Sequence, residues 1–500
     1  MIKARMLKLL IIVSTVCYSQ YYHQGEPLEV FRNPLSGFLS VIMRDGLSSI
    51  NNLSPAFNDR LNLYDFGENP AWITMEERNN GVWVGFYGST IFGGYRRIYD
   101  PARLNYYNIN FVRVENLGKK GVFKGYALYN FEERKGLYRS LLLYPYDGKA
   151  FFVTDTTVGN FRYLGPNIGF DYGFELVKNF FTGLRLRYTL IDGLKDIYTR
   201  PRTIYRDIEC VIGLAFKVME RTSFGFSAVL INSREKIEAK SEDLYDVEIY
   251  FFRGDQYFVK RRANLVEFNL KDRGYAGYTQ LNFSVGKATF GFNIGYKQIG
   301  KYLVVPYGFI EEYEFGYANF ESYMGKFMGR LKASDFLNIA LLIRYEHDDI
   351  WSKHSERNLL LWHEKFDFME YGTGISFRGF KMFPMIAFEF MIRTSRSDSM
   401  KYIDNRFTKL KSVDYSLGGA LEYALDKNFI LGIGMRYQSF TKDIVTGCDN
   451  VKYYEIAGGF EVFQRLRFIF RFARFKNRSV NLLQNEVKND FSCLIIAKLN

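Results

Sequence analysis

Side chains alternate between apolar and polar along most of this chain, and this alternation limits the possible folds more than any other feature. In residues 288–298, ATFGFNIGYKQ, the apolar side chains are Phe290, Phe292, Ile294 and Tyr296. The residues between them are Gly291, Asn293, Gly295 and Lys297. Successive side chains of a β-strand point to opposite faces of the sheet. This segment therefore predicts a strand with one apolar face and one polar face.

The same alternation recurs from residue 81 to the end of the chain. It predicts about 18 strands, within a range of about 14–18. The expected strands are residues 81–90, 105–115, 121–132, 166–177, 180–190, 206–217, 222–232, 274–285, 288–298, 318–331, 336–346, 366–378, 383–393, 413–424, 428–438, 453–462, 466–475 and 489–499. In residues 428–438, for example, Leu431, Ile433 and Met435 share the apolar face.

The connectors between these strands are alternately short and long, and residues 133–165 and 233–273 are the longest. Short turns at one end and longer loops at the other are typical of outer-membrane barrels. A soluble β-sandwich also has alternating strands, but it has no reason to keep its long loops at one end. The sequence therefore predicts an all-β fold. The prediction is a single transmembrane antiparallel up-and-down β-barrel over residues 81–500, with short periplasmic turns, long extracellular loops and both chain ends on the periplasmic side.

Composition agrees with a barrel and disfavours membrane-spanning helices. Aromatic residues make up 18% of the chain, with 38 Tyr and 48 Phe. Barrels use such residues on the lipid face and in aromatic girdles at both interfaces. Mean hydropathy is −0.18, and after the N-terminus no apolar run reaches the ~18 residues that a spanning helix needs. No linker, charge block or shift to helical periodicity divides residues 81–500, so we expect one domain there.

The N-terminal segment has the composition of an export signal. Residues 1–19 combine a basic start, the apolar stretch 9–16 and a small-residue cleavage site before Gln20, which predicts a signal peptide and a location in the bacterial outer membrane. The alternatives are a buried N-terminal helix or a lipoprotein acylated at Cys17. Residues 20–80 are aperiodic and contain four prolines. They form either a periplasmic, partly disordered segment or a small hatch in the lumen.

The polar faces of the predicted strands carry charges of both signs. The basic positions are Arg185, Arg187, Lys297, Arg344, Arg378, Arg393, Arg436, Arg467 and Arg471. The acidic positions are Asp171, Glu175, Glu389, Glu422, Glu455 and Glu461. Because rings of Arg and Lys select anions in pores, the cation excess predicts a weak preference for anionic solutes. The alternative is cross-strand ion pairing, with Asp171 beside Arg185 or Arg187 and Glu461 beside Arg467.

Three of the four histidines, His347, His354 and His363, fall in one predicted outer loop with several carboxylates. Imidazole and carboxylate ligands suit zinc or nickel. The spacing does not match a known ligand motif such as H-E-x-x-H, however. The alternative is a solvated loop with an aromatic tip, formed by Trp351 and Trp362, near the lipid headgroups. We expect no metal and no other cofactor, and these histidines are the only candidate ligands.

Other functional classes find little support in the sequence. No nucleophile elbow, phosphate-binding loop or dinucleotide fingerprint occurs in a suitable context, so we expect no enzymatic activity, with a rim-sited hydrolase as a remote alternative. The isoelectric point is about 9.2, but the cations are spread along the chain and do not form a nucleic-acid-binding patch. Among the cysteines beyond Cys17, only Cys210 with Cys448 suits a disulfide, and we expect both and Cys493 to be unpaired.

The residues Glu68-Asn69-Pro70-Ala71-Trp72-Ile73, just before the first strand, resemble the Asn-Pro-Ala entry of the long-chain fatty-acid transporter family and of the related secretion-shuttle barrels. In those families an N-terminal segment enters the lumen before the first barrel strand, and the resemblance implies the same here. Those barrels have fewer strands and a Gly/Ala-rich N-terminal segment that this chain lacks. As a whole the chain resembles uncharacterised outer-membrane barrels of similar length. No ligand residue is carried over from either resemblance.

At about 16–18 strands a barrel leaves an aqueous channel unless something fills it. The sequence therefore predicts a passive porin-like channel or transporter for small polar or anionic solutes. The alternative is a non-conducting surface or secretion-accessory barrel whose long loops 133–165 and 233–273 bind a partner or polymer. The expected partners are outer-membrane lipid, lipopolysaccharide and the barrel-assembly machinery. The last residue is Asn500, whereas barrels often end in an aromatic that this machinery reads.

Overall fold

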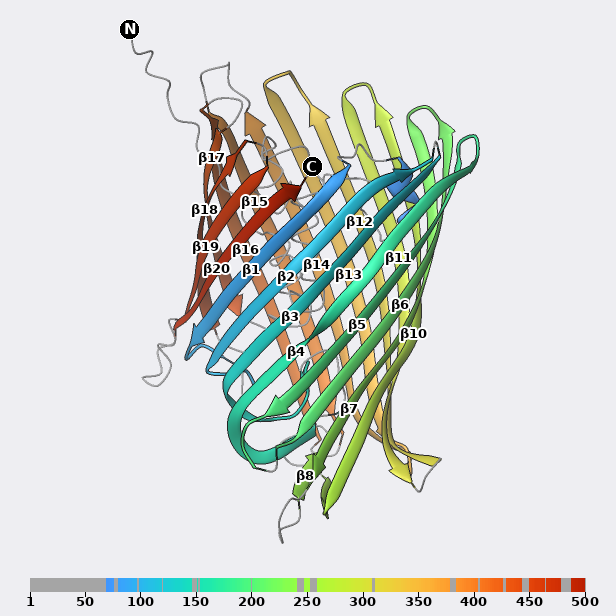
Figure 1. Cartoon of the computed structure of the whole chain (residues 1–500), viewed down its shortest axis with the longest axis vertical. Helices are drawn as coiled ribbons and strands as arrows, with labels where there is room; N and C mark the ends of the chain where they lie inside the picture. The colour runs from blue at the N-terminus through green and yellow to red at the C-terminus, as the bar shows by residue number, and fades with distance from the viewer. Residues whose placement is uncertain are drawn as a thin grey trace.

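The computed structural model shows a closed antiparallel β-barrel (Figure 1). The structure describes residues 69–75, 80–96, 99–118, 120–145, 151, 153–198, 200–240, 247–251, 259–307, 311–377, 384–402, 405–425, 429–442, 449–463, 465–477 and 487–499. The predicted signal peptide, the predicted segment 20–80 up to residue 68, Cys17, Arg378 and Cys448 lie outside these residues. Within the described part, no helix is long and apolar enough to cross a membrane.

One 3₁₀-helix precedes the strands: η2, Pro70–Thr74. The strands of the first half are β1 (Gly81–Gly93), β2 (Arg103–Leu117), β3 (Gly121–Ser140), β4 (Val153–Val177), β5 (Phe180–Lys195), β6 (Arg202–Met219), β7 (Thr222–Lys240), β8 (Val247–Phe251), β9 (Val259–Ala263) and β10 (Leu265–Val285). Those of the second half are β11 (Ala288–Tyr307), β12 (Glu311–Lys332), β13 (Leu337–His354), β14 (Leu359–Phe377), β15 (Met385–Lys401), β16 (Arg406–Ala424), β17 (Phe429–Lys442), β18 (Asp449–Val462), β19 (Leu466–Asn477) and β20 (Val487–Leu499).

The strands close into a ring because the first strand pairs with the last. Trp83 lies opposite Lys498 of β20 and opposite Val112 of β2, so β1 has a neighbour on both edges. β7 pairs directly with β10, which leaves the short hairpin β8–β9 outside the ring and paired to the start of β4. The remaining strands form a closed antiparallel barrel of 18. Closure leaves the barrel without an unpaired sheet edge, as a membrane-spanning sheet requires. The predicted fold class and strand number are confirmed.

The two ends of the barrel differ in their connections. The short turns, such as the one between Val285 and Ala288, lie at one end together with the C-terminal strand end (Figure 1). We call this the short-turn end and the opposite one the long-hairpin end. β4 has 25 residues and β12 has 22, whereas about 9–11 residues suffice to cross a bilayer. Several strands therefore extend well beyond the membrane at the long-hairpin end.

This extension corrects the prediction that residues 133–165 and 233–273 are loops. Much of both segments continues the barrel wall as β3, β4, β7 and β10. Beyond the membrane the alternation inverts, because the outer face there meets water. On β7, Lys236 and Glu238 face outward, whereas Ile237 and Ala239 are buried inside. The prediction relied on apolar residues facing outward, so it ended each strand at the membrane boundary.

The outer face carries two aromatic bands. Tyr275, Tyr296 and Tyr323 lie side by side on β10, β11 and β12, with ring centroids 6.3 and 5.0 Å apart. Closer to the short-turn end, Phe283 and Phe290 stack at 5.0 Å. The same order is present on the far side of the ring, where tyrosines pair on β17 and β18 and phenylalanines meet on β17, β18 and β19. Aromatic residues concentrate at the two membrane–water interfaces of transmembrane barrels, so the bands mark the membrane boundaries.

Candidate permeation path

The segment before the first strand lies inside the barrel. Asn69 begins η2 by accepting a hydrogen bond from the backbone N–H of Ala71 at 3.0 Å. Its side-chain amide donates to the backbone carbonyls of Leu214 and Phe226, on β6 and β7, at 3.0 and 3.1 Å. The indole N–H of Trp72 donates to the side chain of Gln280, and the Trp72 side chain is buried. We call residues 69–75 the luminal anchor, since these contacts fix it to the inner wall.

Glycines make room for the luminal anchor. Gly173, Gly183 and Gly213 lie directly opposite one another on β4, β5 and β6, and Gly225 follows on β7. A Cβ at Gly213 would collide with the Asn69 side chain, and one at Gly225 would collide with Trp72. The four glycines therefore form a flat floor on which the backbone of η2 lies. The sequence showed the Asn-Pro-Ala-Trp segment, but only the strand register reveals the floor.

Gly213→Ala is expected to displace the luminal anchor, because its methyl group would occupy the position of the Asn69 amide. The loss of two hydrogen bonds and part of the Trp72 contact should cost roughly 1–3 kcal/mol. Maleimide labelling of a Thr74→Cys reporter, in a background whose native cysteines are serines, should become at least several-fold faster. Gly418→Ala is the control, since its Cβ meets neighbours only at ordinary distances, 3.7 and 4.0 Å. Equal labelling rates in the two variants would contradict the floor.

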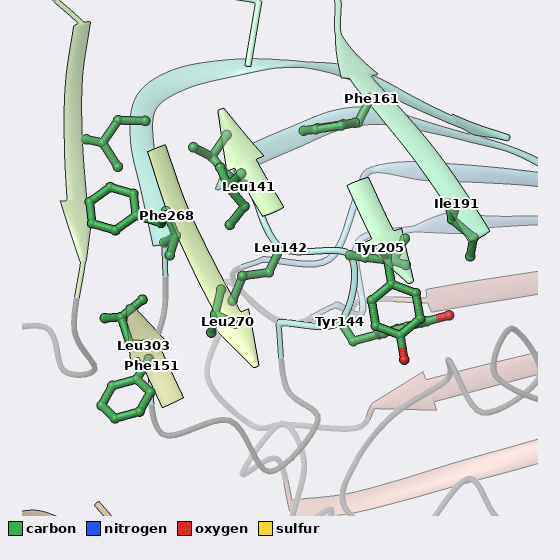
Figure 2. Packing of buried hydrophobic residues seen from close by; sticks show 14 of the residues in the cluster. Leu141, Leu142, Tyr144, Phe151, Phe161, Ile191, Tyr205, Phe268, Leu270 and Leu303 are labelled. Carbon is green, nitrogen blue, oxygen red and sulfur yellow. The ribbon is translucent and has the colours of Figure 1, made fainter. Parts of the chain in front are cut away.

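A large apolar cluster lies inside the barrel at the long-hairpin end (Figure 2). The connection between β3 and β4 folds inward there, and Leu141, Leu142 and Phe151 are almost completely buried. They pack with residues of the inner wall such as Phe268 and Leu303 (Figure 2). The cluster extends over strands from β2 to β14. Part of the predicted outer loop 133–165 thus packs inside the barrel mouth.

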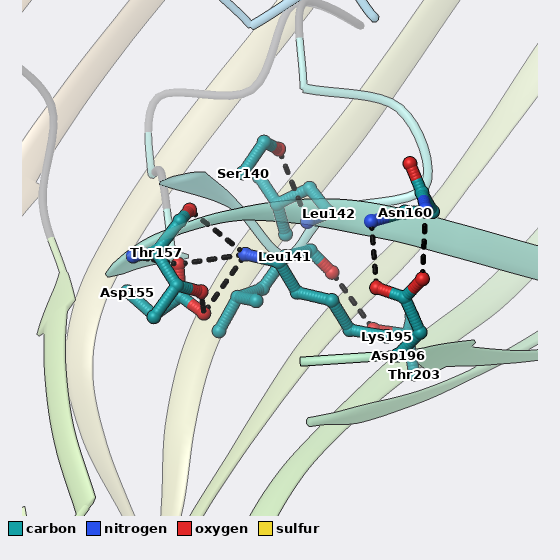
Figure 3. Close-up of polar contacts among 9 residues, drawn as sticks. All are labelled: Ser140, Leu141, Leu142, Asp155, Thr157, Asn160, Lys195, Asp196 and Thr203. Atoms are coloured by element: carbon teal, nitrogen blue, oxygen red, sulfur yellow. Dashed lines mark hydrogen bonds and ion pairs between the residues drawn. The ribbon is translucent and has the colours of Figure 1, made fainter. Parts of the chain in front are cut away.

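Polar contacts fasten this inward connection to the wall (Figure 3). The ammonium group of Lys195, on β5, lies 2.9 Å from both carboxylate oxygens of Asp155 and 3.1 Å from the Thr157 carbonyl. The Lys195 side chain is fully buried and that of Asp155 is only 4% exposed. Burial lowers the pKa of Lys195, and Asp155 opposes this effect. The hydroxyl of Thr203 donates to the Leu141 carbonyl at 2.7 Å.

A pocket remains at the mouth between two connections. It is lined by the end of β1, the β1–β2 connection with Tyr95, Arg96 and Tyr99, the inward residue Pro145 and the start of β20 with Lys488. Its empty volume, open solvent included, is about 510 Å³. None of these lining residues was predicted as a site, because most lie in connections where the alternation gives no signal.

Strand alternation places the predicted charged residues inside the barrel, and most are paired. The two predicted ion pairs form: Arg185 lies 2.7 Å from Asp171, and Arg467 lies 2.8 Å from Glu461. The other predicted basic residues contact as follows: Arg187 with Glu209, Arg344 with Glu346, Arg393 with Glu370, Arg436 with Glu455, Arg471 with Glu455 and Asp490, and Lys297 with the Phe320 ring. Glu389 and Glu422 are buried, whereas Glu175 accepts from the Asn179 N–H at the short-turn end. The interior is therefore largely neutralised by pairs.

Further acidic side chains, which the sequence analysis did not include, also point into the barrel. They are Glu132, Asp155, Glu235, Glu346, Asp348, Glu370, Asp414 and Asp490, all of them buried. Among the described residues, buried carboxylates outnumber buried Lys and Arg side chains. The cation excess on which the predicted anion preference rested is therefore not present in the barrel interior. Only Asp155, Glu235 and Asp348 fall in segments that the sequence analysis predicted as connections, whereas the other five lie within predicted strands and were left out of the inward set.

The three histidines lie on strands and do not converge. His347 and His363, on β13 and β14, face outward and pair with Asp367 and Asp349 at 2.7 and 2.8 Å. His354 is on the other face of β13 and is buried, which lowers its pKa. Within the described residues, no group of three or more His, Cys, Asp or Glu side chains could hold a metal ion. The prediction of a shared outer loop was wrong because β13 and β14 extend to a turn at residues 355–358.

Cys210 and Cys493 form no disulfide in the described part of the chain. Both lie on barrel strands, β6 and β20, at half-buried positions. Cys448, the alternative partner of Cys210, lies outside the described residues, so nothing tests the alternative Cys210–Cys448 pairing.

Comparison with known proteins gives a family but no activity. A family model described as Family of unknown function (DUF6850) matches residues 70–455. No curated protein matches the chain. Among solved structures, the siderophore receptor PiuA from Acinetobacter baumannii is 10% identical with a TM-score of 0.42, covering 84% of this chain and 82% of that one. The copper transporter OprC is 8% identical with a TM-score of 0.41, covering 85% and 81%. The CymD monoaromatic hydrocarbon channel is 9% identical with a TM-score of 0.34, covering 87% and 92%. The resemblance of residues 68–73 to fatty-acid transporters stays a prediction.

Proposed function

The chain belongs to the family of unknown function DUF6850, and from its geometry we propose that it is a passive channel of the bacterial outer membrane for small polar or anionic solutes. In this proposal residues 1–19 direct export, the short-turn end faces the periplasm and the long-hairpin end faces outward. The lipid face between the two aromatic bands supports the membrane location. Barrels of this type have short periplasmic turns and longer outer loops, which supports the orientation.

The mouth pocket is the observation that carries the proposal. It is open between the β1–β2 connection and the inward β3–β4 connection, where a solute would enter. Arg96, Arg134 and Lys488 bring three cations to its wall, of which Arg134 is paired with Glu132, and Asp100 brings one carboxylate. Tyr95 and Tyr99 add aromatic surface with hydroxyl groups that can orient a polar solute. The charge of this pocket, and not that of the deeper interior, supports an anionic solute.

Single-channel recording in planar bilayers tests the proposal. We expect ion conductance from the wild-type protein, with a modest anion preference in reversal potentials at low salt that fades at high salt. The double variant Arg96→Gln/Lys488→Gln should lower the chloride-to-potassium permeability ratio about two- to five-fold, if the two partly exposed charges together contribute about 0.5–1 kcal/mol. The control is Lys409→Gln/Lys411→Gln, which removes two cations from the outer face of β16. Equal effects of the two double variants would contradict entry through the pocket.

A second candidate is supported by the apolar cluster. The inward β3–β4 connection packs against the wall over strands from β2 to β14, and such packing favours a barrel that is closed at the mouth. In this alternative the protein does not conduct and its protruding hairpins, β8–β9 among them, bind a partner or surface polymer. Absence of conductance in both the wild type and a variant with a loosened mouth would favour this role over a channel.

A further inference from the structure

Basic side chains gather on one sector of the outer face. They are Arg396 on β15, Lys409 and Lys411 on β16, Lys452 on β18, and Arg474 and Lys476 on β19. Their outward direction follows from alternation, because neighbours such as Ser412, Tyr453 and Ala473 are buried on the inner side. Lys409, Lys411, Arg474 and Lys476 are exposed. We call these six residues the outer basic patch.

The strand register brings like charges together in the outer basic patch. Lys452 lies directly opposite Lys476, and Arg396 lies directly opposite Lys411. Like charges directly opposite one another destabilise a sheet. Asp398 pairs with Arg396, but in the part of the chain that the structure describes no carboxylate pairs with Lys452, Arg474 or Lys476. These three cations therefore suit an anion from outside the protein.

The outer basic patch lies just beyond the tyrosine band. Tyr437 and Tyr454 stack at 5.3 Å in that band. Lys452 is the next outward residue after Tyr454 on the long-hairpin side, and Arg474 lies directly opposite Tyr454. Interfacial tyrosines lie at the level of the lipid headgroups. The cations thus lie at the depth of the headgroup phosphates.

On β13 and β14, at the same level of the barrel, outward cationic and acidic side chains balance one another. On β13 and β14 the outward residues His347 and His363 each contact a carboxylate, and Lys365 lies 3.8 Å from Asp349. These two strands therefore need no external anion. In this respect they differ from β18 and β19, where the outward cations Lys452, Arg474 and Lys476 pair with no carboxylate of the described residues.

We propose that the outer basic patch binds the phosphorylated headgroup of an outer-membrane glycolipid on the outside of the barrel. Lysine and arginine supply charge-assisted hydrogen bonds to phosphate oxygens, and two phosphates on one headgroup would match the paired cations of β18 and β19. The inference rests on the membrane location in the proposed function but not on conductance. It names the lipid that would surround this sector of the barrel.

Binding of purified lipid A to the full-length protein in detergent tests this inference, with native mass spectrometry as the readout. The triple variant Lys452→Gln/Arg474→Gln/Lys476→Gln should weaken binding of bisphosphorylated lipid A roughly 100-fold, given the usual contribution of each cation near an anionic surface. The matched control Lys353→Gln/Lys365→Gln removes outward cations from the balanced strands and should change binding less than about three-fold. Retained heat-modifiability and full binding by Lys452→Arg/Lys476→Arg would show that the effect follows charge and not folding.

Two further probes identify the source of the phosphate. Dephosphorylated lipid A should bind as weakly to the wild type as bisphosphorylated lipid A binds to the triple variant. Inorganic phosphate at the same concentration should not displace the lipid. Unchanged binding in the triple variant, an equal loss in the control, or tight binding of the dephosphorylated lipid would overturn the inference. Displacement of the bound lipid by inorganic phosphate would show that the outer basic patch binds phosphate and not the glycolipid headgroup. The channel proposal is tested separately by conductance, so a failure of the lipid inference can be told apart from a failure of the channel proposal.

Discussion

Lys195→Ala is expected to destabilise the mouth of the barrel by about 3–5 kcal/mol, because it leaves the Asp155 carboxylate buried without its cation. Asp155 has two 2.9 Å contacts to the Lys195 ammonium and is 4% exposed. Urea unfolding in lipid vesicles measures this loss of stability. If the inward connection is what narrows the mouth, single-channel conductance should also rise in this variant.

The control for this prediction is Arg202→Ala, which breaks a nearby pair with Asp192. That pair is 52% and 38% exposed, so its removal should cost under about 1 kcal/mol. The double variant Lys195→Met/Asp155→Leu should cost less than Lys195→Ala alone, since it removes both buried charges together. A cost for Lys195→Ala as small as that for Arg202→Ala would show that water reaches Asp155 and that the connection is not packed inside.

Leu421→Arg on β16 is expected to cost about 2–4 kcal/mol, because it places a charge on the lipid face near the middle of the membrane. Leu421 is 38% exposed on the outer face and lies directly opposite Ile433, midway along β17 between Tyr437 and Phe429 of the two aromatic bands. Urea unfolding in lipid vesicles is the measurement. The large expected cost depends only on this side chain facing the lipid and not the lumen.

Gly418→Arg is the matched control, three residues earlier on the same strand. Gly418 faces inward, directly opposite Glu389 and Arg436 on the neighbouring strands, and its Cβ position has ordinary contacts. An arginine there can reach a carboxylate and the polar interior, so we expect a cost at least 1–2 kcal/mol smaller, roughly the difference between lipid and polar surroundings. Equal costs for Leu421→Arg and Gly418→Arg would contradict the alternation on which the whole fold assignment depends.

Between the aromatic bands, the sequence alone predicted the strands and the direction of their side chains. Ile433 and Met435 were expected on the lipid face and are exposed there, whereas Gly434 and Arg436 are buried inside. The prediction succeeds because a strand in a membrane has only two environments, lipid and lumen, and they demand opposite polarity. The short turns also have a local signal, as in the Gly286-Lys287 connection, where Gly286 adopts a φ of 59°.

Beyond the membrane the same reasoning failed, because both faces of a strand can be polar there and the inner face can be apolar. Residues 133–165 and the histidine segment around His354 were predicted as loops, and both contribute to long strands. The partner of Lys195 was invisible for a related reason. Asp155 is 40 residues away in sequence, and only the pairing of β4 with β5 brings the two side chains together.

The sequence by itself determined that this chain forms a closed barrel of about 18 alternating strands with short turns at one end, since local polarity encodes each strand and its face. Tertiary structure alone decided what occupies the interior. The glycines of β4 to β7 become a floor for Trp72 only when the strands align in register. Leu141 and Phe151 become part of a core only when their connection turns into the mouth. Such contacts join residues far apart in the chain, and no local pattern records which of them will meet.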